Sequence, residues 1–111
     1  MTSKETVTDL RLLMEELLGQ AATHHSHRAA STLVFGPLMR ATAIALTAGA
    51  ELAEHDSPPA ASLHVLTGTV RLYSGADEWL LSAGQLVAIP SARHGLTAIT
   101  DAVVLLTVAL A

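Results

Sequence analysis

Residues 49–68 decide the fold of this chain and read Gly49-Ala-Glu-Leu-Ala-Glu-His55-Asp-Ser57-Pro-Pro-Ala-Ala61-Ser-Leu-His-Val-Leu-Thr-Gly68. Two runs in this stretch, 51–55 and 62–67, are predicted to be strands because residues that favour turns bound each of them. The turn between them falls at Asp56-Ser-Pro-Pro59. Gly68 then allows a sharp pivot into the next run. The stretch therefore predicts two consecutive short strands, each followed by a change of chain direction.

The same alternation of short strands and turns continues along the chain. Turn signals such as Gly36-Pro37, Ser74-Gly-Ala-Asp77 and Ser82-Ala-Gly84 recur between apolar runs. Strands are predicted over 32–35, 40–47, 51–55, 62–67, 69–74, 78–81, 85–90, 95–100 and 102–110. Short strands at intervals of roughly ten residues are typical of a closed antiparallel sandwich or barrel.

The N-terminal segment has a different period. Apolar residues recur at helical intervals between Val7 and Leu18. Thr2 and Glu5 have the spacing of a capping box, and Gly19 stands where a C-cap would fall. We therefore expect an amphipathic helix, whose apolar stripe packs against either the barrel or a second subunit.

These patterns divide the chain into three parts. We expect the N-terminal helix over 1–22, a polar linker over 23–31 and a barrel over 32–111. A polar linker of this kind is usually a solvated loop. Its alternative role is a metal-binding patch, formed by its three histidines, His24, His25 and His27.

A second stretch, residues 84–94, reads Gly84-Gln-Leu-Val-Ala-Ile-Pro90-Ser-Ala92-Arg-His94. Together, the two stretches resemble the paired motifs of the cupin family, G-x5-H-x-H-x3,4-E-x6-G and G-x5-P-x-G-x2-H-x3-N. In the second, Gly84 and Pro90 match, Ala92 replaces the glycine, and His94 comes one residue early. The resemblance covers roughly residues 40–110. It implies an all-β chain folded as a cupin jelly-roll β-barrel, preceded here by the helix.

The resemblance also implies a metal site. Many cupins hold Fe, Mn, Zn, Ni or Cu with two histidines and a glutamate from the first motif and one histidine from the second. The matching positions here are His55, Ser57, Ala61 and His94. Firm mononuclear sites use at least three protein ligands, and only His55 and His94 are good ligands. The predicted metal ligands are therefore His55 and His94, for a weakly held divalent transition metal.

Strand alternation limits which neighbours can complete that site. Glu54 is adjacent to His55 and should point to the opposite face, whereas Glu51 shares the face of His55 but lies about 13 Å away along an extended strand. His64 differs in parity from Ala61, so without a bulge it faces away from the barrel interior. None of these three side chains is expected to supply the third ligand.

Three more side chains are candidates for contact with a ligand. Arg71 and Tyr73 share one face of their strand, and Trp79 lies on the next. Aromatic residues in a small barrel mostly fill the core or an interface, which is the alternative role for Tyr73 and Trp79. The predicted pocket is a largely aliphatic cavity with a few polar contacts. These contacts are His55, Ser57, His94, Arg71 and Tyr73.

Composition narrows the class of protein. The 111 residues suffice for one domain, half of them are hydrophobic, and the formal net charge is −4. Without clustered cations, we expect no nucleic-acid partner. No apolar run approaches the ~18–20 residues of a membrane span, and no signal-peptide core is evident. Cysteine is absent, so disulfides and thiolate sites are excluded. We expect a cytoplasmic protein without a membrane partner.

Charge content also bears on assembly. Charged residues make up only 14% of the chain. A sparse charge content and an apolar helix stripe both fit a surface that a partner subunit covers. We therefore expect a homodimer.

Three interpretations of function stay open. The first and preferred one is a small cupin barrel that binds a small molecule, with or without a weakly held metal. The second is a metal-dependent cupin enzyme, such as a dioxygenase, isomerase or decarboxylase, completed by a further ligand. The third is a regulatory or scaffolding homodimer that acts through its surface. The sequence shows no nucleophile elbow, glycine-rich phosphate loop or H-E-x-x-H motif.

Overall fold

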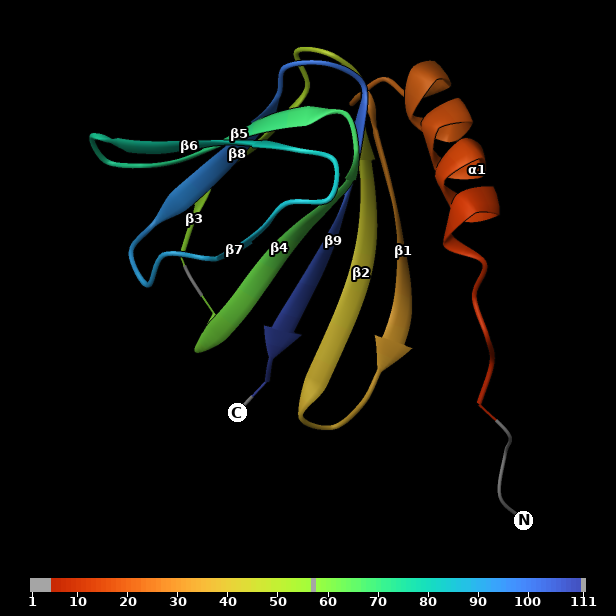
Figure 1. Ribbon diagram of the computed structural model, residues 1–111, viewed down its shortest axis with the longest axis horizontal. Coiled ribbons are helices and arrows are strands. Elements are labelled where there is room, and N and C mark those ends of the chain that lie inside the picture. The colour runs from red at the N-terminus through yellow and green to blue at the C-terminus, as the bar shows by residue number, and fades with distance from the viewer. Residues whose placement is uncertain (1–4, 57, 111) are drawn as a thin grey trace.

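The computed structural model describes residues 5–56 and 58–110. Within these residues, one helix precedes nine strands (Figure 1). Most strand boundaries lie within two residues of those expected from the sequence. The elements are α1 (Leu10–Thr23), β1 (Arg28–Phe35), β2 (Met39–Leu46), β3 (Glu51–His55), β4 (Ala60–Thr67), β5 (Thr69–Ser74), β6 (Asp77–Ser82), β7 (Leu86–Ala88), β8 (His94–Ala98) and β9 (Ala102–Ala109).

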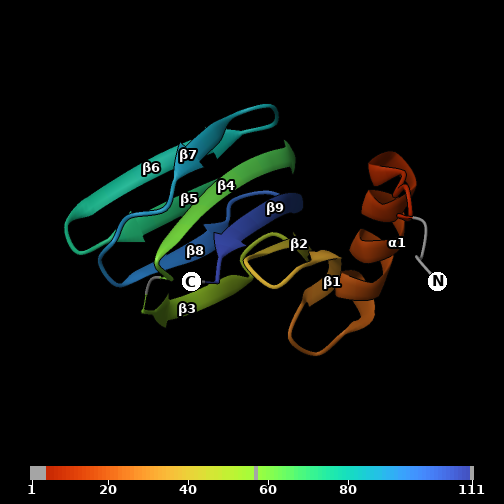
Figure 2. The same cartoon turned by 90° about the horizontal axis from the view of Figure 1, so that it is seen from below.

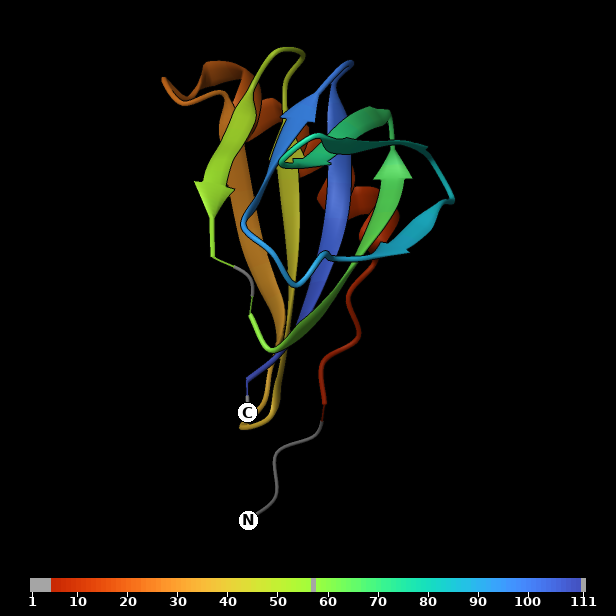
Figure 3. The same cartoon turned by 90° about the vertical axis from the view of Figure 1, so that its left-hand side faces the viewer.

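The strands form two antiparallel sheets that face each other. The five-stranded sheet has the order β1-β2-β9-β4-β7, and the four-stranded sheet has the order β3-β8-β5-β6. Strands distant in sequence are neighbours, such as β2 with β9 and β3 with β8. Figure 3 shows the smaller sheet in front of the larger one, with α1 behind both. The expected jelly roll is confirmed. The expected closed barrel is wrong, because the described strands form two sheets that keep separate edges.

The core lies between the sheets and is aliphatic. Alternate residues of the inner strands point into it, so β5 buries Val70 and Leu72 while Arg71 and Tyr73 face outward. With only three aromatic residues in the chain, small branched side chains fill the space. The buried members are Leu46, Leu63, Val65, Val70, Leu72, Leu81, Leu96, Ala98, Ala102 and Val104.

Helix α1 packs on the outer face of the five-stranded sheet (Figure 2). Its buried Leu17 and Ala21 meet Ala43 and Ala45 of β2 and Val103 of β9. The two alanines carry little bulk, so the helix can approach the strand closely. The helix stripe is therefore covered by the chain's own sheet, and it no longer supports a dimer.

The helix begins at Leu10, later than the residue pattern predicted. Asp9 is the N-cap, because its Oδ1 accepts hydrogen bonds from the amides of Arg11 (3.0 Å) and Leu12 (3.3 Å). The expected capping box is wrong: Glu5 precedes the helix, and Thr2 lies outside the described residues. Among the described residues, no helix has both the length and the apolar character to cross a membrane.

The helix also ends later than expected, and the segment after it is short. Gly19 lies inside α1, which continues to Thr23 and buries Ala21 two residues further along. Strand β1 begins at Arg28, inside the range expected to be a linker, because it pairs along its length with β2. The histidines of the intervening turn are exposed, as expected for a solvated loop. These are His24, His25 and His27.

Candidate functional site

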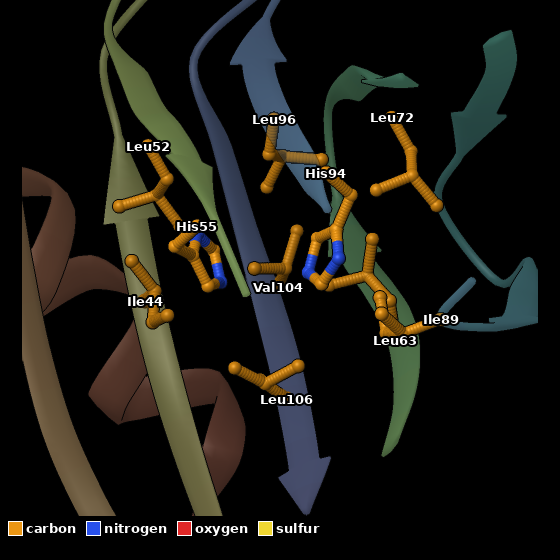
Figure 4. A pocket seen from close by; sticks show the side chains of 10 residues that line it. All are labelled: Ile44, Leu52, His55, Leu63, Leu72, Ile89, His94, Leu96, Val104 and Leu106. Atoms are coloured by element: carbon orange, nitrogen blue, oxygen red, sulfur yellow. The ribbon is translucent and has the colours of Figure 1, made fainter. Parts of the chain in front are cut away.

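The structure brings His55 and His94 together in the space between the sheets. Strand β3 pairs with β8, and His55 is the direct cross-strand partner of His94. Their ring centroids lie 4.6 Å apart, with 63° between the ring planes. Figure 4 shows the two rings close together and inclined to each other, with Val104 and Leu106 of β9 nearby.

A bulge in β3 sets the direction of His55. Leu52 pairs with Leu96 and His55 pairs with His94, so three steps along β3 match two steps along β8. The extra residue in a bulge changes which face the following side chain points to. His55 therefore shares the inner face with Leu52. The expectation that it shares a face with Glu51 is wrong.

Each ring is held by a backbone carbonyl two residues before it. Nδ1 of His55 lies 3.0 Å from the Ala53 oxygen, and Nδ1 of His94 lies 3.1 Å from the Ala92 oxygen. A carbonyl oxygen only accepts, so each Nδ1 donates and carries the proton of the neutral ring. Nε2 is then the nitrogen with a free lone pair. Within residues 5–56 and 58–110, neither Nε2 has a hydrogen-bond partner.

The rest of the cavity wall is aliphatic. The cavity encloses about 320 Å³ of empty space, including its open side. His94 is only 5% exposed, whereas His55 is exposed, so the cavity reaches solvent beside His55. Eight apolar side chains from both sheets complete the wall: Ile44, Leu52, Leu63, Leu72, Ile89, Leu96, Val104 and Leu106.

Two of the predicted pocket residues lie elsewhere. Arg71 is on the outer face of the four-stranded sheet, where its Nε lies 2.6 Å from Oε2 of Glu78. Its guanidinium group also stacks on the ring of Tyr73, 4.7 Å from the centroid. Tyr73 lies across Gly95, its cross-strand partner. Neither Arg71 nor Tyr73 lines the cavity.

The other candidate residues lie outside the cavity or outside the described residues. Trp79 packs against the core, which is the alternative role given for it above. Ala61 lies on β4 and does not line the cavity. Its carbonyl oxygen accepts a hydrogen bond from the amide of Ile89. His64 is on the opposite face of β4 from the buried Leu63. Ser57 lies outside the described residues, so its place in the pocket stays a prediction.

The apolar wall was not among the predicted site residues. Part of its signal is present in the sequence, because alternate apolar residues on β5 mark the inner face. Leu52 and Leu96 also flank the histidines at short range. The alternation of apolar and polar residues marks the inner face of a strand, but it does not show where side chains leave a cavity between the sheets.

The donor atoms present do not fit a self-sufficient metal centre. Among the described residues that line the cavity, only His55 and His94 carry polar side chains, and Ala61 offers no ligand. Glu54 faces outward, where its Oε2 lies 3.7 Å from Nε of Arg93. Among the described residues, no three histidine, cysteine, aspartate or glutamate side chains are grouped to hold a metal ion. A firm site needs at least three protein ligands.

Comparison with solved structures identifies the fold. A conserved protein of unknown function from Streptococcus pyogenes matches with a TM-score of 0.77 and 23% identity, over 99% of this chain and 91% of that one. An RmlC-like cupin from Shewanella frigidimarina matches with a TM-score of 0.69 and 22% identity, over 76% and 77%. A cupin-2 domain protein from the same organism matches with a TM-score of 0.71 and 14% identity, over 91% and 92%.

No protein-family model matches the sequence, and no curated protein matches it either. At the identities found among solved structures, the likeness concerns the fold. It agrees with the two facing sheets and with the two motif stretches, which supply the paired histidines of β3 and β8. The chain therefore has the fold of a small cupin domain.

Proposed function

We propose that this protein binds a small molecule in the cavity between its sheets, with His55 and His94 as the polar contacts. The observation that carries the proposal is the pair of unpartnered Nε2 atoms in an otherwise aliphatic cavity. A ligand site of this kind combines apolar walls with a few convergent polar groups. His55 is exposed and Nε2 of His94 is not fully buried, so water can reach both rings. A ligand that replaces this water with its own hydrogen bond and adds apolar contacts gains affinity.

A fragment screen by NMR tests this proposal. Binders are expected to shift the amide resonances of lining residues such as Leu63, Leu96 and Val104. The substitution Leu106→Phe narrows the cavity and should abolish those shifts. Leu80→Phe, at an exposed position on β6, is the matched control and should leave them unchanged. If no fragment shifts the lining amides, or if Leu106→Phe binds as well as the original protein, the proposal is wrong.

The alternative function, a metal-dependent enzyme, requires a bound metal ion. His55 and His94 are too few ligands to hold one firmly. Two imidazoles supply two ligands, so any Zn, Ni, Fe, Mn or Cu in the cavity would rely on solvent or on a bound molecule for the rest. Nothing among the described residues favours a particular reaction. We therefore keep small-molecule binding as the proposed function.

A second proposal concerns assembly: a further copy of this chain covers the end of the molecule at the β1–β2 hairpin. Phe35 and Leu38 are 77% and 67% exposed there, and Met39 is partly exposed beside them. The hairpin lies next to the C-terminal end of β9, where the Leu110 amide bonds to the Leu38 carbonyl (Figure 1). Large apolar side chains gathered at one end favour a covered surface.

Sedimentation velocity tests the assembly. We expect a dimer at micromolar concentration and a monomer after Phe35→Glu. Leu80→Glu adds the same charge at an isolated position that is 65% exposed, and it should leave the dimer intact. A monomeric original protein, or a dimer that survives Phe35→Glu, contradicts the proposal.

A further inference from the structure

We infer that the ligand of the cavity is a neutral molecule with a hydrogen-bond donor, such as a hydroxyl group, on a small apolar body. This inference rests on the proposed function and names the chemical class that the site selects. Three features carry it: the fixed tautomers of His55 and His94, the uncharged wall, and the limited space inside.

The tautomers make both imidazoles acceptors toward the cavity. The carbonyl oxygens of Ala53 and Ala92 take up the Nδ1–H groups, at 3.0 and 3.1 Å. The neutral rings then present two Nε2 lone pairs and no N–H group to a ligand. A ligand with only acceptors would be repelled by these lone pairs, and a purely apolar ligand would leave both of them unpaired. A ligand that donates satisfies at least one.

The wall disfavours a charged ligand. None of the described residues that line the cavity is Lys, Arg, Asp or Glu. The nearby charges pair with one another outside the cavity, because Nη1 of Arg93 lies 3.7 Å from Oδ1 of Asp56 and its Nε the same distance from Oε2 of Glu54. A carboxylate would find no cation inside, and an ammonium group would find no anion. Either ion would lose its hydration without a compensating partner.

The space limits the size of the bound group. The space open to water-sized molecules is small, about 30 Å³, so only a small group can be enclosed. The donor and a small apolar group therefore fit inside, and the exposed side of the cavity beside His55 leaves room for the remainder.

Four probes of similar shape test the inference at pH 8, where imidazole is neutral. Phenol is a neutral donor, toluene has the same shape without the donor, benzoate is an anion and benzylammonium is a cation. Affinities come from NMR titration of the lining amides. We expect phenol to bind roughly tenfold more tightly than toluene, as one additional hydrogen bond would give. Benzoate and benzylammonium should bind more weakly than toluene.

Variants and a direct spectrum separate the donor effect from packing. The double variant His55→Leu/His94→Leu should lose the preference for phenol, while His24→Leu/His25→Leu, in the exposed turn, should keep it. Long-range ¹H–¹⁵N spectra of the imidazoles in the unaltered protein do not depend on how well the variants fold. They should show Nδ1 protonated and Nε2 unprotonated on both rings. An Nε2–H tautomer on either ring would overturn the inference.

The outcomes also separate this inference from the proposed function. If toluene equals phenol at the same amides, the donor class is wrong but the cavity still binds ligands. The same conclusion follows if benzoate or benzylammonium binds most tightly. If no probe shifts the lining amides, both the inference and the proposed function fail.

Discussion

Leu52 and His55 point to the same side of β3 although three positions separate them. In a regular strand, residues at an odd spacing point to opposite faces. The bulge between them adds one residue and restores a common direction. With this odd spacing, the position of His55 beside His94 therefore depends on the bulge.

Deleting Ala53 leaves two steps between Leu52 and His55, so a regular β3 should still direct His55 into the cavity opposite His94. We expect the nuclear Overhauser effects between the rings of His55 and His94 to persist in this variant. Inserting one alanine after Ala53 instead moves His55 one step further along β3 and should turn it out of the cavity, so these effects should disappear. Ring-to-ring effects that persist after the insertion would show that the bulge does not set the direction of His55.

Metal retention should be low. After equilibrium dialysis against Zn²⁺ and then buffer, we expect well under one ion per chain, because two protein ligands do not make a firm site. The experiment uses a His24→Ala/His25→Ala background, so that the exposed turn contributes nothing. Stoichiometric zinc that vanishes on His55→Ala would reveal a third ligand and revive the enzymatic interpretation.

Arg71 should be irrelevant to the cavity. Its guanidinium group pairs with Glu78 and stacks on Tyr73 outside the sandwich. We expect Arg71→Ala to leave phenol affinity unchanged within about twofold and to lower the free energy of unfolding by at most about 1 kcal/mol, as for an exposed ion pair. A large loss of phenol affinity, measured by NMR titration, would place Arg71 in the site after all.

Replacing Gly68 or Gly49 by alanine should destabilise the protein to different extents, although the two glycines have similar backbone conformations. Both have positive φ, at 81° and 86°, but a methyl group at Gly68 would overlap the carbonyl oxygen of Asp101, whereas one at Gly49 meets nothing. Urea denaturation should show a loss of about 1 kcal/mol for Gly49→Ala. Gly68→Ala should lose clearly more, because the clash adds to the backbone strain. Equal losses would mean that the chain near Asp101 moves aside freely.

Asp9 should stabilise the start of α1. Removing the carboxylate in Asp9→Ala leaves the amides of Arg11 and Leu12 without their acceptor and should lower the free energy of unfolding by about 1 kcal/mol. Asp9→Asn keeps a capping oxygen and should lose less. A lower melting temperature for Asp9→Asn than for Asp9→Ala would contradict the assignment of Asp9 as the N-cap.

Turn residues and apolar alternation were sufficient to predict most of the strands, because both repeat along the chain. The resemblance of two stretches to the cupin motifs supplied the jelly roll and placed His55 and His94 in one cavity, whereas the expected closure of the barrel was wrong. It did not reveal the bulge after Leu52, since a bulge leaves the residue pattern of a short strand unchanged. Arg71 and Tyr73 were placed in the pocket although Val70 and Leu72 mark the apolar face of the same strand. The helix start was missed because Val7 extends the helical period before the true N-cap.

The two imidazoles are not held equally. His94 is on β8, which has a neighbour on each side, whereas His55 is near the end of β3, the outermost strand of its sheet. Loosening β3 would carry one ring away while the other stays fixed. A molecule entering from solvent would pass the exposed His55 first and reach the buried His94 last. The rates of entry and release would then depend on the motion of one edge strand, β3.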